Sequence, residues 1–227
     1  MCDLTPSLPR AVLIHYDEIG LKGGNRAFFE RALLKNAEAA TASVIKLSFQ
    51  RLPGRHLADL PEDVDLEVLA THLRRVFGCA SFSFPYVVEA NFDALSAAAR
   101  VAIAEAPGAT FAVRAKTAHT KSGLRAQQLH IDLGTFLIEA GAGRVDLSNP
   151  DRTLRVEVVG ERALVYARKY AGPRGLPVGT AGKVATLLSA GLDSPIAALR
   201  LMNRGARSQM IHFHSQPYTD GSSVRNA

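Results

Sequence analysis

The most constraining part of this chain is a strand, a turn of small residues and a helix in direct succession. Residues 184–188 (VATLL) are apolar apart from Thr186 and predict a strand. Residues 189–194 (SAGLDS) predict a turn, and Pro195 suits the first turn of a helix that runs to about Asn203. A second strand is predicted at residues 209–213. This order predicts a right-handed βαβ unit with two parallel strands.

The turn at 189–194 has the features of a phosphate-binding loop. Successive backbone N–H groups and the positive end of the helix converge on one point, and the serine hydroxyls add donors. Ligands of parallel sheets bind at the carboxyl ends of the strands. We therefore expect the residues that end the two strands to lie together at that edge: Leu187, Leu188, His212 and Phe213.

Three rival motifs do not match this region. A P-loop requires glycine where the chain has Pro177, and Lys183 is followed by valine. A nucleophile elbow requires glycine at position 187, which is leucine, and no G-x-G-x-x-G follows the strand. His212 and His214 with Asp193 raise a metal site or a catalytic triad as alternatives. The favoured interpretation is that the two histidines lie on one face of a strand beside a nucleotide pocket.

The N-terminal third of the chain predicts a ferredoxin-like unit. Apolar runs, helical periodicity and turn residues alternate there in the order β-α-β-β-α-β. The expected elements are a strand at 11–16, a helix at about 25–42, a strand at 44–49, a turn at Pro53-Gly54, a helix over 66–76 and one strand over 81–90.

A second α/β unit and an ordered linker follow. The pattern predicts a helix over 92–103, a strand over 110–115, a helix over 126–140, and a hairpin of strands 156–159 and 163–167 around Gly160-Glu161. Residues 171–179 are too rich in glycine and proline for a regular element.

The charge distribution points to a polyanionic partner. The net charge is +6, and residues 169–227 carry 7 basic and 2 acidic side chains. Residues 110–130 contain no acid, which makes a phosphate-backbone contact one interpretation and a solvated basic face the other. The RNA-binding candidates in that segment are Arg114, Lys116, Lys121 and Arg125.

Two cysteines limit the covalent chemistry. Cys2 and Cys79 are too few for a disulfide framework or a four-ligand zinc site, and we expect Cys79 to be a small buried apolar residue. No apolar run is long enough to cross a membrane, and the N-terminus does not have the pattern of a signal peptide. These features predict a cytoplasmic protein without a membrane partner.

Three separate segments carry a family resemblance. Residues 187–195 (LLSAGLDSP), with 175–179 and 212–218 on either side, resemble the PP-loop ATP pyrophosphatase region of the tRNA 4-thiouridine synthase family, the tRNA sulfurtransferases. Residues 14–26 are similar to its N-terminal ferredoxin-like opening, and residues 145–151 resemble the end of its THUMP domain.

The resemblance implies three domains. They are an N-terminal ferredoxin-like domain at 1–60, whose last elements extend to about 90, a THUMP RNA-binding domain at 61–168, and the first part of a PP-loop domain at 172–227. The implied fold class is α/β with an α+β N-terminal part, and the last domain has a Rossmann-like parallel sheet.

The resemblance also implies the site residues. Asp193 and Ser194 would be catalytic, with Asp193 orienting Mg²⁺ or the phosphates of ATP. Contacts to ATP would come from Leu187, Leu188, Ser189, Gly191, Asp193, Ser194, His212 and Phe213. No residue is assigned as a direct metal ligand.

The implied reaction is ATP-dependent sulfur transfer that makes 4-thiouridine in tRNA, with sulfur transfer for thiamine thiazole synthesis as a further role. Adenylation of the uridine C4 oxygen precedes displacement of AMP by persulfide sulfur from a cysteine desulfurase partner. The implied assembly is compatible with a homodimer.

The resemblance places the family's catalytic cysteine beyond Ala227, so the chain alone is expected to be catalytically incomplete. The alternatives are a non-catalytic tRNA-binding fragment and a PP-loop ATP pyrophosphatase acting on another substrate.

Overall fold

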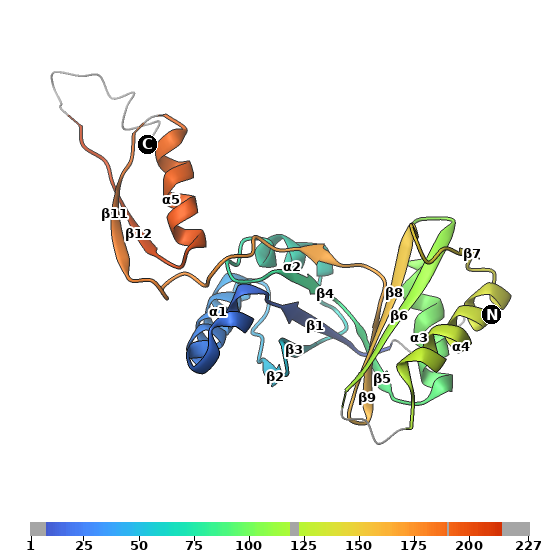
Figure 1. Ribbon diagram of the computed structural model, residues 1–227. Helices are drawn as coiled ribbons and strands as arrows, with labels where there is room; N and C mark the ends of the chain where they lie inside the picture. The colour runs from blue at the N-terminus through green and yellow to red at the C-terminus, as the bar shows by residue number, and fades with distance from the viewer. Residues whose placement is uncertain (1–7, 119–122, 190, 215–227) are drawn as a thin grey trace.

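The computed structural model describes residues 8–118, 123–189 and 191–214. In this part of the chain the elements form a ten-stranded mixed sheet, covered by four helices, and a separate two-stranded parallel sheet with one helix (Figure 1). The order of strands and helices and the parallel pairs make the fold mixed α/β, as the sequence predicts.

The first unit has the ferredoxin-like order of elements. Its central strand β1 is antiparallel to β3 and β4, and α1 and α2 pack beside one another. Its elements are β1 (Arg10–His15), two 3₁₀ turns (Glu18–Leu21 and Gly23–Asn25), α1 (Arg26–Thr41), β2 (Gln50–Leu52), β3 (Arg55–Leu60), α2 (Leu66–Leu73) and β4 (Ser81–Ser83).

One buried cluster holds this unit together. Ile14 of β1, Leu33 of α1 and Leu69 of α2 are fully buried in it, together with Phe82 of β4. Burying apolar surface of this kind is the main stabilising contribution to folding. The helix and strand between residues 66 and 83 therefore pack with the N-terminal strands, and the division of the chain into domains stays a prediction.

The strand expected at 44–49 is wrong. Residues 45–49 form no strand, and the short β2 begins only at Gln50. Leu47 is buried, and Ile45 and Phe49 pack against the same core. The alternating apolar pattern thus reports which side chains are buried, whereas the backbone of this segment does not pair with a neighbouring strand.

The prediction of a single strand over 81–90 is also wrong, because this segment forms two strands. β4 ends at Ser83 and β5 (Tyr86–Glu89) begins after Phe84-Pro85. Proline has no N–H to donate to a ladder. β4 pairs with β1, whereas β5 pairs mainly with β9, so the break lies where the chain passes from the first unit to the second.

The second unit contains β5, α3 (Phe92–Ala104), β6 (Thr110–Ala118), α4 (Ala126–Glu139), β7 (Arg144–Val145), β8 (Arg152–Val159) and β9 (Arg162–Tyr166). β6 and β8 are parallel, and β8 and β9 form the predicted hairpin. Helices α3 and α4 lie on one side of this part of the sheet (Figure 1). The other face, which we call the helix-free face, carries the polar side chains of β6 and β8.

The two units share one sheet through β5 and through the short strand β10 (Tyr170–Ala171), which pairs with β4. A small buried cluster between them includes Leu13 of β1, Leu57 of β3 and Leu164 of β9. These residues come from both units, so the two units share buried surface.

The third unit consists of β11 (Lys183–Leu187), α5 (Asp193–Asn203) and β12 (Arg207–Ile211). β11 and β12 are parallel, and their unit lies at the opposite end of the molecule from α4 (Figure 1). The second strand begins and ends two residues earlier than the sequence predicts, so His212 and Phe213 follow the strand. The two histidines at 212 and 214 therefore do not share a strand face.

The linker is ordered by hydrogen bonds on both sides. Gly172 and Arg174 donate to the carbonyl groups of Ala80 and Cys79, and Leu176 donates to that of Asn203. None of the helices in the described part combines the length and apolar character needed to cross a membrane.

Candidate functional site

The turn between β11 and α5 brings together two serine hydroxyls and an open helix end. The Ser189 N–H donates to Ser194 Oγ at 3.0 Å, and the two hydroxyl oxygens lie 3.1 Å apart. The Gly191 N–H points to Ser189 Oγ at 3.4 Å. Leu192, the N-cap of α5, makes no side-chain capping bond, so the first N–H groups of the helix are available to an anion.

Asp193 is exposed in the first turn of α5. Its carboxylate can hold a cation that also contacts phosphate oxygens, as one or two carboxylates do in Mg²⁺–phosphate sites. Among the described residues no group of three or more His, Cys, Asp or Glu side chains is arranged to hold a metal ion by itself. A cation bound at this turn would therefore need the phosphate oxygens of a bound nucleotide as further ligands.

The four residues expected at the strand ends do lie at one edge. The Leu188 N–H donates to the Ile211 carbonyl at 2.8 Å, and His212 Nδ1 lies 2.9 Å from the Leu188 carbonyl oxygen. Leu187 and Phe213 are 63% and 76% exposed, so their apolar surface is open to a ligand.

His212 Nε2 is buried and has no hydrogen-bond partner among the described residues. Because Nδ1 donates to the Leu188 carbonyl, Nε2 is left as an acceptor in the neutral ring. A buried polar atom without a partner beside an uncapped helix end fits a polar ligand such as a nucleotide.

The structure divides the four basic residues of the predicted RNA patch. Arg114 and Lys116 are exposed on β6, on the helix-free face, and Arg114 also donates to the Leu147 carbonyl at 2.8 Å. Arg125 is the exposed N-cap residue of α4. Lys121 lies outside the described residues, so the structure places two of the four together.

Two further basic residues join Arg114 and Lys116. Arg155 of β8 is in register with Arg114, and Lys169 is exposed just before β10. Burial and the positive charge of Arg155 lower the pKa of the Lys169 ammonium; Glu157 opposes this effect, and Lys116 and Arg174 add to it. We call Arg114, Lys116, Arg155 and Lys169 the basic strip.

Sequence reasoning missed Arg155 and Lys169. The hairpin strand expected at 156–159 begins four residues earlier, at Arg152. If the alternation of polar and apolar residues had been extended back to Thr153, it would have placed Arg155 and Glu157 on the polar face. The register of β8 with β6 and the position of Lys169, in contrast, depend on strand pairing between distant segments.

His130 holds α4 against β6. The Ala115 N–H donates to His130 Nε2 at 2.7 Å. β7 pairs with β6 only at Thr110 and Phe111, so it does not extend as far as Ala115. The His130 ring therefore accepts the Ala115 N–H in place of a neighbouring strand. His130 therefore stabilises the edge of the sheet.

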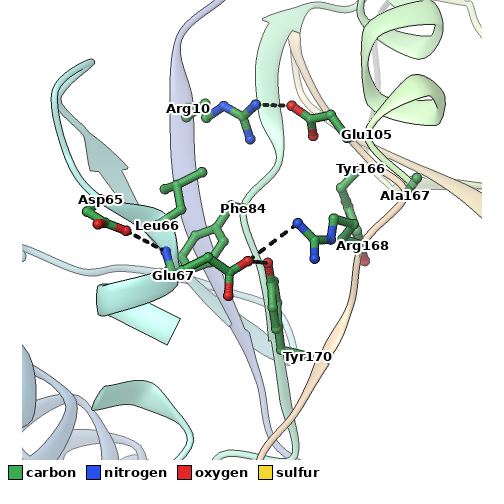
Figure 2. Close-up of a pocket in the computed structure, with 10 residues that line it drawn as sticks. All are labelled: Arg10, Asp65, Leu66, Glu67, Phe84, Glu105, Tyr166, Ala167, Arg168 and Tyr170. Atoms are coloured by element: carbon green, nitrogen blue, oxygen red, sulfur yellow. Dashed lines mark hydrogen bonds and ion pairs between the residues drawn. The ribbon is translucent and has the colours of Figure 1, made fainter. Parts of the chain in front are cut away.

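A pocket of about 380 Å³ lies where the first two units meet (Figure 2). Arg168 lies 3.4 Å from Glu67, and Tyr170 Oη donates to the same carboxylate at 2.9 Å. Arg10 pairs with Glu105 on the opposite wall, and Asp65 caps α2. The charged side chains named here already pair with other groups of the protein. We therefore interpret the pocket as part of the contact between the two units.

Cys79 is fully buried, as expected. Burial, with a smaller effect of Asp17, raises the pKa of its thiol to about 12. The nucleophilic form of cysteine is the thiolate, so Cys79 is a structural residue.

Family models match three consecutive parts of the chain. The model described as "ThiI ferredoxin-like domain" matches residues 11–83, the model "THUMP domain" matches residues 89–168, and the model "Thiamine biosynthesis protein (ThiI)" matches residues 179–226. The order of the three matches is the order of the three structural units.

Two curated relatives bear the name "Probable tRNA sulfurtransferase". The one from Moorella thermoacetica is 38% identical over 210 residues, which are 92% of this chain and 53% of the relative. The one from Bacillus subtilis is 36% identical over 211 residues, 92% of this chain and 52% of the relative. The chain thus spans about half the length of the curated relatives it matches.

Two solved structures share the fold. A 4-thiouridine synthetase in complex with RNA and bound ATP aligns with a TM-score of 0.83 and 34% identity, over 94% of this chain and 55% of that one. PH1313 from Pyrococcus horikoshii aligns with a TM-score of 0.82 and 23% identity, over 95% of this chain and 72% of that one. The second likeness concerns the fold alone.

Proposed function

Because this chain belongs to the ThiI family of tRNA sulfurtransferases, we propose that it binds tRNA and ATP for the synthesis of 4-thiouridine. One observation carries the proposal: an uncapped helix end with two converging serine hydroxyls and a basic strip on an open sheet face occur in one chain. The first suits a nucleotide phosphate, and the second suits an RNA backbone.

The turn and the ends of β11 and β12 would hold ATP. Ser189, Gly191 and Ser194 donate hydrogen bonds to phosphate oxygens, and Asp193 orients Mg²⁺ or the phosphates. Leu187 and Phe213 offer apolar surface to the base or sugar, with Leu188 and His212 beside them. ATP supplies the activating group that turns the uridine C4 oxygen into a leaving group.

Sulfur transfer would follow on the activated uridine. A persulfide sulfur attacks C4, the C4–S bond forms, and the C4–O bond to the adenylate breaks with release of AMP. A second thiol then attacks the inner sulfur of the persulfide, which breaks the S–S bond, forms a disulfide and leaves the outer sulfur on C4 as 4-thiouridine. A cysteine desulfurase is the proposed sulfur donor. Cys79 is buried with a raised thiol pKa, so it is not the proposed sulfur carrier. Sulfur transfer for thiamine thiazole synthesis is a second proposed use of the same chemistry.

The ferredoxin-like and THUMP units would hold the tRNA. Arg114, Lys116, Lys121 and Arg125 are proposed phosphate contacts, and Arg155 and Lys169 extend the surface along the helix-free face. We place the reaction in the cytoplasm, with the homodimer as the proposed assembly.

The RNA part is tested by titrating the chain with folded tRNA at several salt concentrations. Replacing Arg114 and Lys116 by glutamine is expected to weaken binding and to flatten the log–log salt slope by up to about one unit per lost phosphate contact. The matched control replaces Arg31 and Lys35, which are exposed on α1. Equal losses in both double variants would show that only net charge matters and would contradict the assignment.

The nucleotide part is tested by Mg·ATP binding and, in a complete-length version that includes the family's catalytic cysteine, by tRNA-dependent AMP formation. Asp193→Ala is expected to weaken Mg·ATP binding about tenfold or more, because the ionic interaction of the carboxylate with the cation and the phosphates is lost. Asp63→Ala, an exposed carboxylate in the first unit, is the control. Unchanged ATP binding and AMP formation in the Asp193 variant would refute the site.

A further inference from the structure

Glu157 is a carboxylate buried at the boundary between the first two units. It lies on β8, on the helix-free face, and its side chain is 8% exposed. Tyr166 Oη donates to Oε1 at 2.8 Å, Arg55 Nε lies 2.9 Å from Oε2, and His15 Nε2 lies 3.4 Å from Oε1.

Two of these three partners belong to the other unit. His15 ends β1 and Arg55 begins β3, and the two residues are opposite one another in the β1–β3 register. Burial alone would raise the pKa of Glu157, but the hydrogen bond from His15, the charge of Arg55 and the hydrogen bond from Tyr166 lower it to about 2. The carboxylate is therefore an anion at neutral pH.

Other ion pairs across the boundary are weaker. Arg162–Asp59 and Arg168–Glu67 join the units with side chains that are about half exposed or more, and Arg10–Glu105 joins them with side chains that are 24% and 35% exposed. Exposed pairs contribute little because water screens them. A buried pair, in contrast, cannot lose one partner without leaving an uncompensated charge. Glu157 is thus the most deeply buried carboxylate among these ion pairs between the two units.

The same carboxylate lies within the basic strip. In the β6–β8 register it is opposite Lys116, and Arg155 is two residues before it on the same face. Arg55, which it binds, comes from the first unit. Glu157 therefore joins basic residues of the second unit to a basic residue of the first.

We propose that Glu157 is a positioning residue for RNA, which holds Arg55 and the first unit against the basic strip so that one phosphate-binding surface spans both units. This inference rests on the proposed RNA-binding function. It assigns a negatively charged residue a positive effect on the binding of a polyanion.

A positioning role and a purely electrostatic role of Glu157 predict opposite changes in tRNA affinity. Removing a negative charge beside phosphates strengthens binding if only charge matters. If Glu157 positions the units, Glu157→Gln weakens the binding of folded tRNA, by roughly tenfold. Glu161→Gln, at the exposed β8–β9 turn, makes the same charge change and is expected to bind equally well or more tightly.

A second readout does not depend on RNA. Spin labels at Glu38 of α1 and Glu139 of α4, in a Cys2→Ser background, report the distance between the two units. The distance distribution is expected to broaden in Glu157→Gln and to stay narrow in Glu161→Gln. Tyr166→Phe, which leaves the net charge unchanged, is expected to broaden it less and to weaken binding less.

The outcomes separate the two proposals. Tighter or equal tRNA binding by Glu157→Gln, or weaker binding with an unchanged distance distribution, overturns the positioning role. If Glu157→Gln does not fold, Tyr166→Phe with wild-type affinity and a wild-type distance distribution overturns it. A wild-type chain that does not bind tRNA refutes the proposed function, whereas the spin-label distances still test the contact between units.

Discussion

His56 is a buried histidine whose protonation is disfavoured in the folded chain. It is fully buried on β3, and neither ring nitrogen has a hydrogen-bond partner among the described residues. Burial lowers its pKa to about 4; Glu30 opposes the shift, and Arg51 and Arg26 add to it. Between pH 6.5 and pH 4 the unfolded chain binds more protons than the folded one, so stability falls as the pH falls through this range.

We expect the free energy of unfolding to drop by about 1–2 kcal/mol between pH 7 and pH 5 through this residue. His56→Leu is expected to remove most of that drop, as urea unfolding at the two pH values would show. His214→Leu, at an exposed position, is the control and is expected to keep it. An equal pH dependence in wild type and His56→Leu would contradict the assignment.

Among the helices, α2 has the clearest local signal for where it begins. The Asp65 carboxylate accepts the N–H groups of Glu67 and Val68 at 3.0 and 3.1 Å. Asp65→Ala is expected to lower the free energy of unfolding by about 1 kcal/mol, because two helix N–H groups lose their acceptor. Asp65→Asn retains a capping oxygen and is expected to lose much less in the same urea titration. Equal losses would indicate that the charge stabilises the helix and that the cap does not.

Local signals of this kind explain how much of the fold could be predicted. Helices α1, α3 and α4 and the β8–β9 hairpin follow from apolar periodicity and turn residues. Periodicity failed at 44–49 because Leu47 is buried without being in a strand, and at 81–90 because Pro85 divides the strand.

The candidate site divides in the same way. The turn at 189–194 is local and was found from sequence. Arg155 and Lys169, in contrast, come near Lys116 through strand pairing between distant segments. No short stretch of sequence records that pairing.

The third unit is held to the first by the linker and by a few polar contacts. Arg204 donates to both carboxylate oxygens of Glu18, at 3.1 and 2.8 Å, and Asn36 donates to the Val178 carbonyl. Gly175 has a φ of 73°, and a Cβ there would lie 2.3 Å from the Asn203 carbonyl oxygen. The linker can therefore approach α5 only with glycine at this position.

Gly175→Ala is expected to loosen the third unit, with faster hydrogen exchange in α5 and in residues 172–179. Gly182→Ala is a matched control, because Gly182 also has a positive φ, of 80°, but nothing lies within 4 Å of its added Cβ. Both variants carry backbone strain of about 1 kcal/mol or more, and only Gly175→Ala adds the clash. Equal exchange rates in the two variants would show that the contact with Asn203 is unimportant.

The pairing of β10 with β4 has a consequence during translation. Tyr170 and Ala171 are opposite Phe82 and Ser81, and the rings of Phe82 and Tyr170 stack with their centres 5.1 Å apart. Until Ala171 has left the ribosome, this side of β4 is an open strand edge, for on the order of ten seconds at ordinary rates of synthesis. Open edges recruit other strands. The nascent chain is therefore most exposed to aggregation while the whole second unit is being made, and a chain cut just after residue 168 would keep that vulnerability permanently.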